Sequence, residues 1–363
     1  MDLHDDAAQA EFRRGLRAFL AERLPETDPR GWSKALSEAG YAGLTWPVEH
    51  GGRGLPATYQ AIYAEESAQA GAPDHVNVIG LNMVGPTITR YGSPAQKAAY
   101  LARILSGEAI FCQGFSEPDA GSDLAAIRTR AEAVPGGYLL NGQKVWSSYA
   151  HLADYCLLLA RTDPSAVKHQ GLTCFLVDMR APGVRVAPLR QISGDSDFNE
   201  IVLTDVRVGD GDVLGAPGDG WRVALTTLAH ERGTFGITLT ARLAVQFERL
   251  VATVHARGAT SNPVVREAVA DLFVRLEALR YTGYRALSAL VRTGEPGPES
   301  SVLKLEWSLA NQRLAALALA LAPTDAHWRQ LRLRSRANSI EGGTSEILRG
   351  IIAERVLGLP RTR

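Results

Sequence analysis

The sequence has few of the features that assign a chain to a special class of protein. Three of its 363 residues are cysteines, Cys112, Cys156 and Cys174, an odd number without CxxC spacing. This pattern indicates neither a disulfide framework nor a zinc site, and favours buried free thiols. The longest apolar run, Leu314 to Ala322, is shorter than the roughly 20 residues that a membrane-spanning helix needs. We therefore expect no metal centre and no membrane span, and interpret the run as a buried helix segment that ends at Pro323.

An excess of charge of either sign is also missing. The 39 Lys and Arg residues balance 39 Asp and Glu residues, so the formal net charge is zero. This balance gives no electrostatic reason to expect nucleic acid or an anionic membrane as the main partner. The acidic N-terminus, residues 1–12, lacks the basic and apolar regions of a signal peptide. A cytoplasmic globular protein is expected.

Residues 1 to about 110 carry helical periodicity. Apolar residues recur on one face of a first expected helix, at Phe12, Leu16, Phe19 and Leu20. Ser93, Pro94 and Gln96 form a capping-box pattern, which predicts a helix that runs to about Leu105 and stops before Gly107.

The pattern changes to short alternating stretches between Ile110 and about Val208. Residues 183–187 and 201–208 alternate with a period of two, and Asn141-Gly142 is typical of a β-hairpin turn. The glycine-rich residues 215–220 predict a linker. Long helical patterns then resume at Trp221, with breaks near 257–263, 294–299 and 323–325.

The order helices, strands, helices predicts an α+β multidomain fold. We expect a helical N-terminal domain at 1–110, a β domain at 111–217 and a helical domain at 218–363. Separate runs of helices and strands argue against a doubly wound nucleotide-binding fold. No GxGxxG or GxxxxGK[ST] segment is present, so the common phosphate-binding loops are not indicated.

Three polar clusters are candidates for the chemistry. They are the segments QGFSEPDAGSD at 113–123, NGQKVWSS at 141–148 and SIEGGTSEI at 339–347. Taken singly, each also fits a bland interpretation: the first a tight surface loop, Trp146 a core residue, and the third a glycine-rich helix start.

Together the three clusters resemble the acyl-CoA dehydrogenase family. Its members typically show TEPxAGSD, then NGxKxWITN, then an EGTxEIQR-type segment near the C-terminus. The counterparts here are SEPDAGSD, NGQKVWSSY and GGTSEILR, in the same order and spacing, and the ending AERVLGLPR also matches. The resemblance implies an N-terminal helical domain, a β-barrel-like middle domain, a C-terminal four-helix bundle and a noncovalent FAD.

The resemblance also implies roles for individual residues. Phe115 and Ser116 are expected to contact the flavin ring, with Gln113 a less certain neighbour, and Trp146 to pack against the ring. Ser148 takes the place of a threonine that hydrogen-bonds flavin N5. Ser122 is expected near the cofactor phosphates or the acyl-CoA, and Thr344 and Glu346 along the FAD.

The family's reaction needs a base for the α-proton, and a carboxylate with a raised pKa suits this role. Members with straight-chain substrates usually place this glutamate directly before the Gly-Thr of the C-terminal motif, but Gly342 stands there in this chain and Glu341 lies one residue earlier. Isovaleryl-type and several steroid-side-chain-type members instead carry the base in an LxxER stretch, which matches Glu231.

The local pattern gives Glu231 independent support. Thr227, Glu231, Thr234 and Thr238 form a polar stripe on one expected helix, beside an apolar stripe of Leu225, Leu228, Phe235 and Leu239. A carboxylate beside apolar surface is where burial raises a pKa. The bland alternative is an exposed Glu-Arg pair. Arg232 is a weaker candidate for holding the thioester, and His230 and His151 are interpreted as incidental.

Two family segments, RxxFG and the QxxGGxG stretch that receives the adenine half of FAD, have no clear match here. Three hypotheses follow. The first is FAD-dependent α,β-dehydrogenation of an acyl-CoA or acyl-carrier thioester, with branched or bulky acyl groups favoured. Electrons would pass to an electron-transferring flavoprotein, in a homodimer, homotetramer or hetero-oligomer. The second is a non-catalytic partner subunit of a hetero-oligomeric enzyme, and the third a flavin oxidase or monooxygenase of the same fold.

Overall fold

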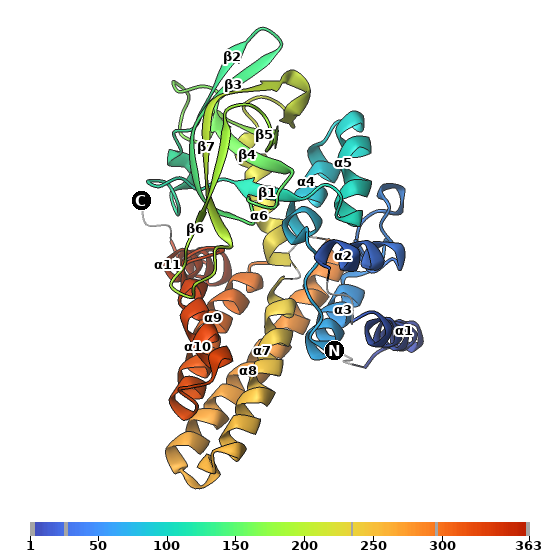
Figure 1. Cartoon of the computed structure of the whole chain (residues 1–363), viewed down its shortest axis with the longest axis vertical. Coiled ribbons are helices and arrows are strands. Elements are labelled where there is room, and N and C mark those ends of the chain that lie inside the picture. The colour runs from blue at the N-terminus through green and yellow to red at the C-terminus, as the bar shows by residue number, and fades with distance from the viewer. Residues whose placement is uncertain (1–3, 25–27, 234, 295–296, 361–363) are drawn as a thin grey trace. The chain divides into compact units, whose positions relative to one another are not determined.

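The computed structural model describes residues 4–24, 28–233, 235–294 and 297–360 (Figure 1), and of residues 231–233 and 235 it describes only the backbone. The chain forms two compact units. Unit 1 contains Met1–Leu24, Leu55–Ala72 and Glu231–Arg363, and unit 2 contains Pro25–Gly54 and Pro73–His230. Each unit therefore gathers segments that are far apart in the sequence.

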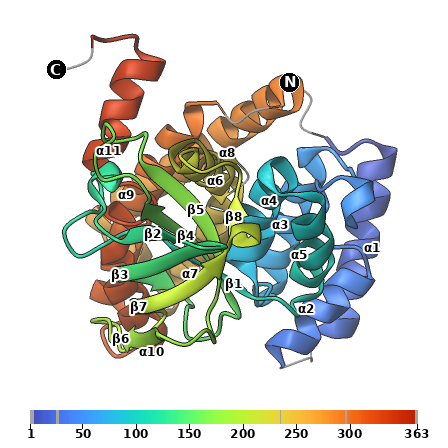
Figure 2. The same ribbon diagram turned by 90° about the horizontal axis from the view of Figure 1, so that it is seen from above.

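Unit 2 is built around an eight-stranded sheet, whose strands lie side by side in Figure 2. The strand order is β6-β7-β3-β2-β4-β5-β8, and β1 pairs in parallel with β4. The strands are β1 (Phe111–Gly114), β2 (Arg130–Val134), β3 (Gly137–Ser148), β4 (Tyr155–Arg161), β5 (Leu172–Asp178), β6 (Val184–Leu189), β7 (Phe198–Gly209) and β8 (Val213–Leu214). The strands expected at 183–187 and 201–208 are thus confirmed as parts of β6 and β7.

The expected hairpin turn at Asn141-Gly142 is wrong. Both residues lie inside the continuous strand β3, at a bulge in its pairing with β7. The Asn141 amide exchanges two 2.9 Å hydrogen bonds with the backbone N–H and carboxylate of Asp205. A Cβ on Gly142 would lie 2.7 Å from the Thr129 Cα, so close strand packing requires glycine here. The tight turn lies earlier, at Pro135-Gly136, between β2 and β3.

Helices of unit 2 pack with the sheet around a shared hydrophobic core. They are α4 (Gly85–Tyr91), α5 (Pro94–Ser106) and the first part of α6 (Gly220–Gly233), and α2 (Pro29–Glu38) packs on α5. The capping box is confirmed: Ser93 accepts from the Gln96 N–H, the Gln96 side chain accepts from the Ser93 N–H, and Gly107 ends α5 in a left-handed conformation. Strands β4 and β5 are buried on both faces, so the sheet is covered on both sides there.

Unit 1 is entirely helical in its described part. Its helices are α1 (Ala7–Arg23), α3 (Ala57–Ala70), α7 (Phe235–Ala256), α8 (Pro263–Thr293), α9 (Glu299–Leu321), α10 (Ala326–Arg334) and α11 (Ser345–Ile351). These bounds confirm the three expected helix breaks. The apolar run from Leu314 lies on α9, where Leu314, Ala315 and Ala318 are buried.

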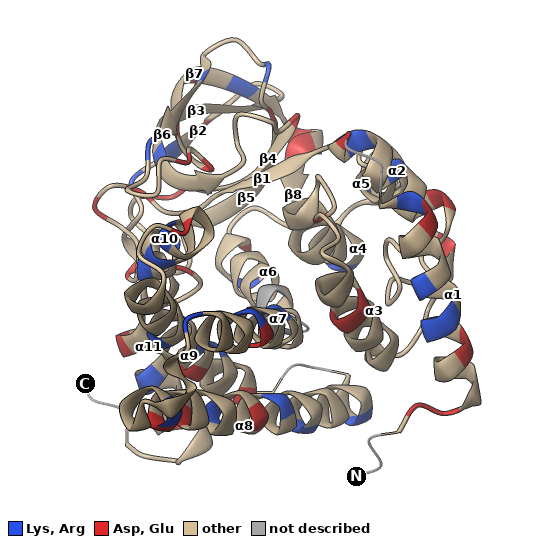
Figure 3. Cartoon of the chain, turned by 60° about the horizontal axis from the view of Figure 1, so that its bottom comes forward, with Lys and Arg blue, Asp and Glu red and all other residues tan. Residues whose placement is uncertain are grey.

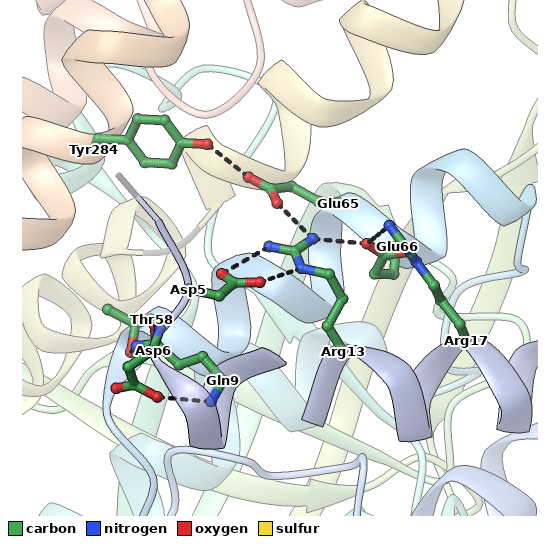
Figure 4. A network of polar contacts seen from close by, with 9 residues as sticks. All are labelled: Asp5, Asp6, Gln9, Arg13, Arg17, Thr58, Glu65, Glu66 and Tyr284. Carbon is green, nitrogen blue, oxygen red and sulfur yellow. Dashed lines mark hydrogen bonds and ion pairs between the residues drawn. The ribbon is translucent and has the colours of Figure 1, made fainter. Parts of the chain in front are cut away.

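A polar network joins α1, α3 and α8 within unit 1 (Figure 4). Arg13 on α1 contacts three carboxylates, those of Asp5 at 2.6 Å, Glu65 at 3.1 Å and Glu66 at 2.7 Å. Arg17 contacts Glu66 at 2.6 Å. The Tyr284 hydroxyl on α8 donates to the other oxygen of Glu65 at 3.0 Å. The network therefore holds three helices from distant parts of the chain.

Charges of both signs are interspersed along the helices, as α1 and α8 show in Figure 3. All three cysteines are buried free thiols, as expected. Among the helices of the described ranges, none combines the length and the apolar character that crossing a membrane requires.

Candidate functional site

The first candidate segment folds as a tight loop directly after β1. Glu117 and Ala120 exchange two backbone hydrogen bonds of 3.0 Å each, which close the loop. Gln113 and Ser116 are half-buried and Ser122 is exposed. Phe115 is only 5% exposed, and its ring lies in the hydrophobic core. The loop thus leaves Ser116 and Ser122 accessible while the Phe115 ring anchors it.

A buried ion pair connects this loop to the second candidate segment. The Lys144 side chain on β3 is 0% exposed, and its Nζ donates to the Glu117 carboxylate at 2.8 Å and to the Phe115 carbonyl at 3.0 Å. The Val145 N–H donates to the Ser116 carbonyl at 3.0 Å. Loop and strand are therefore fixed against each other by both side-chain and backbone contacts.

Glu117 is supported by more than the lysine. It accepts hydrogen bonds from the backbone N–H groups of Arg128 at 2.6 Å and Thr129 at 2.8 Å. Burial by itself would raise the pKa of Glu117, but the attraction of Lys144 and these hydrogen bonds outweigh it and hold the pKa below its usual range. The carboxylate is therefore ionised at neutral pH.

Trp146 follows the ion pair in an unusual backbone conformation. Its φ of 62° is left-handed, at a break in the β3–β7 register between Lys144 and Ser147. For a residue with a bulky side chain this conformation costs about 1–3 kcal/mol. The indole is nevertheless 61% exposed, and it makes an edge-to-face contact with Phe198, at 6.1 Å between ring centroids. A strained backbone that displays a large aromatic ring is characteristic of a ligand contact.

The two serines after Trp146 face different surroundings. Ser147 is 1% exposed, and its hydroxyl has no hydrogen-bond partner among the described residues, whereas Ser148 is half-buried. An exposed indole beside a half-buried hydroxyl fits a flat, polar-edged aromatic group such as the ring of FAD. Trp146, Ser148 and Ser116 are candidates for contact with it, since each is exposed or half-buried.

The third candidate segment lies in unit 1, at the start of α11. Gly342 and Gly343 have φ values of 61° and 97°, which favour glycine. Thr344 is the N-cap of α11 and accepts from the Ile347 N–H. Glu346 is exposed, and hydrogen bonds from its own backbone N–H and from Thr344 hold its pKa below the ordinary value. These residues shape a rigid helix start.

Glu341 is tied into this framework. Arg334 contacts both of its oxygens, at 3.1 and 2.9 Å, and the Asn338 amide donates to it at 2.8 Å. Asn338 is held in turn by α9, since its carbonyl accepts from Lys304 at 2.6 Å and Ser308 at 2.8 Å. Glu341 therefore has the environment of a structural carboxylate.

Glu231 and Arg232 lie near the C-terminal end of α6, but their side chains are outside what the structure describes. The helix expected to carry the polar stripe is described as α6 up to Gly233 and as α7 from Phe235 onward. Thr234 lies outside the described residues. Thr227 is fully buried, and its hydroxyl bonds to the Val223 carbonyl and, at 3.0 Å, to Thr87. The members of the expected polar stripe with described side chains are Thr227 on α6 and the half-buried Thr238 on α7.

Gln113, Phe115, Ser116, Ser122, Trp146 and Ser148 all belong to unit 2, while Thr344 and Glu346 belong to unit 1. Sequence reasoning missed Lys144 and Glu117, although both lie inside the motifs. The available signal was a lysine within a strand and a glutamate in the adjoining loop, two charges that need each other if buried.

Comparison with known proteins gives a consistent result along the whole chain. Family models described as the N-terminal, middle and C-terminal domains of acyl-CoA dehydrogenase match residues 6–108, 112–206 and 218–357. The chain is 42% identical over 389 residues to "Acyl-CoA dehydrogenase IpdE1" of Mycolicibacterium smegmatis, covering 97% of this chain and 98% of that protein.

Solved structures agree. "Tcur3481-Tcur3483 steroid ACAD" matches with a TM-score of 0.89 and 31% identity over 100% of both chains. The "ChsE4-ChsE5 complex from Mycobacterium tuberculosis" matches with a TM-score of 0.87 and 29% identity, also over 100% of both chains.

Proposed function

Because this chain belongs to the acyl-CoA dehydrogenase family, whose cofactor is FAD, we propose that it introduces an α,β double bond into a branched or bulky acyl thioester. When bound, FAD supplies the hydride acceptor. The chain's own contribution is to bind and orient the thioester, to hold the cofactor and to remove the α-proton. The proposed electron acceptor is an electron-transferring flavoprotein.

This proposal rests on one observation: the C-terminal motif offers no free carboxylate that could act as the base. Gly342 has no side chain, and the Glu341 carboxylate is already engaged by Arg334 and Asn338. Neither residue suits proton removal, since a base needs a free carboxylate within reach of the substrate. Glu231, in the LxxER stretch, is the carboxylate that we propose as the base, with Arg232 as a thioester contact.

The proposed cofactor contacts follow the geometry of each residue. Trp146 offers an exposed ring face, Ser148 a half-buried hydroxyl and Ser116 a polar contact beside them. Gln113 on β1 and Phe115 just after it would support the flavin-ring site, and Thr344 and Glu346 would contact FAD from the start of α11. The exposed Ser122 is proposed to contact phosphates of FAD or of the thioester carrier. A steroid-derived acyl group is supported by the name of the similar "steroid ACAD" structure.

The test uses the visible absorption band of the flavin-loaded protein. Anaerobic addition of straight-chain, branched and steroid-type acyl-CoAs should bleach the band with one of the bulky classes. Glu231→Gln should retain flavin and bleach about 10²–10⁴-fold more slowly, because general bases typically contribute a factor of that size. Glu341→Gln is the matched control and should still bleach. The reverse pattern would overturn the assignment of the base.

A second candidate is a partner subunit in a hetero-oligomer. Gly342 and the unmatched adenine-side segments favour it, and the ChsE4-ChsE5 structure is titled a complex of two proteins. Such a subunit should purify without flavin when expressed alone and gain flavin when coexpressed with a homologous partner. Full flavin content of the chain alone, as a homodimer or homotetramer, would exclude this candidate.

A further inference from the structure

Lys304 is a buried lysine near the start of α9 that contacts two places in the third candidate segment. The residue is only 8% exposed. Its Nζ donates to the Asn338 carbonyl at 2.6 Å and to the Gly343 carbonyl at 2.9 Å. One ammonium group therefore connects two backbone positions on either side of Gly342, and we call this pair of contacts the Lys304 bridge.

The stretch inside the bridge is weakly constrained by its own backbone. A 3₁₀ helix at Ser335–Ser339 precedes it, and α11 begins only at Ser345. Between these elements Gly342 and Gly343 follow each other in left-handed conformations. Fixing a glycine costs more conformational entropy than fixing any other residue. A defined path through two successive glycines therefore depends on contacts from outside the stretch.

Helix α9 supplies these contacts from one of its faces. Lys304, Ser308 and Asn311 are spaced at i, i+4 and i+7, so they lie on the same side of the helix, and all three are buried. Ser308 donates to the Asn338 carbonyl at 2.8 Å, and the Asn311 amide donates to the Asn338 side chain at 2.9 Å. Ser308 and Asn311 thus hold the beginning of the stretch, and Lys304 holds both its beginning and its end.

The end of the stretch is where it meets the proposed cofactor contacts. Thr344 directly follows Gly343, is half-buried and caps α11. A displacement of the Gly343 carbonyl would therefore also displace Thr344 and the first turn of α11, which carries Glu346. Binding groups need to be held within about 0.5 Å of their productive positions. Loss of the Lys304 bridge should thus affect a ligand at this helix start.

We propose that Lys304 is a positioning residue for FAD: the Lys304 bridge fixes the path of the two glycines and thereby the place at which Thr344 and Glu346 contact the cofactor. Lys304 acts through Gly343 and is not a catalytic residue. The inference rests on the proposed function, which assigns FAD contacts to the start of α11.

The test measures the affinity for FAD and needs no turnover. Equilibrium dialysis of the flavin-loaded full chain against a series of FAD concentrations gives the Kd of the unaltered chain and of Lys304→Met. Methionine fills a similar volume but donates no hydrogen bond, so the Kd should rise about tenfold, a change of about 1.4 kcal/mol. Excess FAD should then restore most of the flavin bleaching, because the bridge acts on cofactor binding and not on proton removal.

The matched control is Leu314→Ala, which weakens the same helix without removing a contact of the bridge. Leu314 is buried in a hydrophobic cluster that includes neither Lys304 nor residues 338–343. The cavity that this substitution leaves should lower the urea midpoint of the flavin-free chain at least as much as Lys304→Met does. The Kd for FAD should nevertheless stay at the unaltered value, measured without urea, where the chain is folded.

A second variant, Lys304→Gln, tests the bridge with a smaller loss of packing and serves if Lys304→Met does not fold. Its amide can donate, but the side chain is one bond shorter than lysine and should not hold both carbonyls, so the Kd should again rise. The proposal is overturned if the Kd is unchanged in the Lys304 variants. It is also overturned if Leu314→Ala raises the Kd as much as they do, which would make Lys304 a purely structural residue.

Failure of the proposed function is separately visible. A raised Kd in the Lys304 variants, together with no bleaching of the unaltered chain by any acyl-CoA, would support the bridge and contradict dehydrogenation. Bleaching of the unaltered chain, together with an unchanged Kd in the variants, would do the opposite. If the chain holds flavin only beside a homologous partner, the same comparison is made on the coexpressed complex.

Discussion

Two ion-pair systems hold distant segments together in this chain, and they do so in contrasting ways. In unit 2, the fully buried Lys144 meets the single carboxylate of Glu117. In unit 1, Arg13 contacts three carboxylates and Glu66 accepts from two arginines (Figure 4). The first system concentrates its charge in one pair beside the candidate flavin site, whereas the second distributes it over three helices.

The two ion-pair systems differ in whether a charged residue keeps another partner when one partner is removed. A distributed network keeps alternative partners when one member is removed, so its losses should be partial. A single pair without solvent leaves an uncompensated buried charge when either partner is removed, which is among the costliest changes in a protein. The candidate flavin site therefore lies beside the ion-pair system that is less tolerant of losing a member, the Lys144–Glu117 pair.

The largest expected effect is that of Lys144→Met. It leaves the Glu117 carboxylate buried without its counterion and should lower the free energy of unfolding by about 3–5 kcal/mol, as measured by the shift of the urea midpoint. Flavin retention should fall with it, since Glu117 and Phe115 lose their link to β3.

Lys34→Met is the control, because Lys34 is 68% exposed and pairs only weakly with Glu38 at 3.8 Å. It should change stability by less than about 0.5 kcal/mol. A second variant, Lys144→Met/Glu117→Leu, should remain destabilised, because the N–H groups of Arg128 and Thr129 lose their acceptor. Full recovery in that variant would contradict our account of the pair.

Glu66→Gln should have the next largest effect. Glu66 is 4% exposed, but Arg13 retains Asp5 and Glu65 as partners. We expect a loss of about 2 kcal/mol, in the range for a hydrogen bond to a charged group. A loss as large as that of Lys144→Met would show that the network is not redundant.

Acid should weaken both systems. Burial raises the pKa of Glu66, but Arg17 and Arg13 outweigh it, so its folded-state pKa is lowered, as is that of Glu117. The stability that these groups supply is present above their unfolded-state pKa, about 4.3, and is lost as pH falls through the folded-state value. Between pH 5 and pH 3, the urea midpoint should fall more steeply for the unaltered chain than for Glu66→Gln. Parallel slopes would contradict the lowered pKa.

Tyr284→Phe should have the smallest effect. It removes one hydrogen bond to Glu65, a carboxylate that also contacts Arg13, so the loss should be about 1 kcal/mol. The contribution of Tyr284 and Glu66 can be compared in a double-mutant cycle, in which a coupling of less than about 0.5 kcal/mol would indicate independent contacts.

Features encoded within a few residues could be predicted from the sequence. The capping box at Ser93 and the helix breaks after Ala256 and Thr293 depend on local hydrogen bonding and backbone preference, and both are as expected. The same local reasoning failed at Asn141-Gly142, because the deciding partners lie far away in the sequence: Asp205 on β7, and Thr129 just before β2. Asn and Gly are typical of tight turns because they tolerate unusual backbone angles, and a β-bulge accepts the same two residue types.

In the candidate site, too, features within a short motif could be predicted from the sequence, and contacts between distant segments could not. Motif resemblance predicts Trp146, Ser148 and Thr344 as cofactor contacts, and these stay predictions, but a similarity between residue types does not say which charges are buried. The pairing of Lys144 with Glu117 spans 27 positions of sequence and is visible only once β3 lies against the loop. For Glu231, whose side chain is not described, the assignment as base stays a prediction.

The exposure of Trp146 also has an optical consequence. Of the six tryptophans, Trp32, Trp46 and Trp328 are buried and Trp221 and Trp307 are half-buried, so Trp146 alone has an indole that is mostly in water. The long-wavelength edge of the fluorescence emission should therefore come mainly from this one ring. A chromophore stacked on it would quench that edge selectively, so the unlabelled protein contains its own reporter of occupancy.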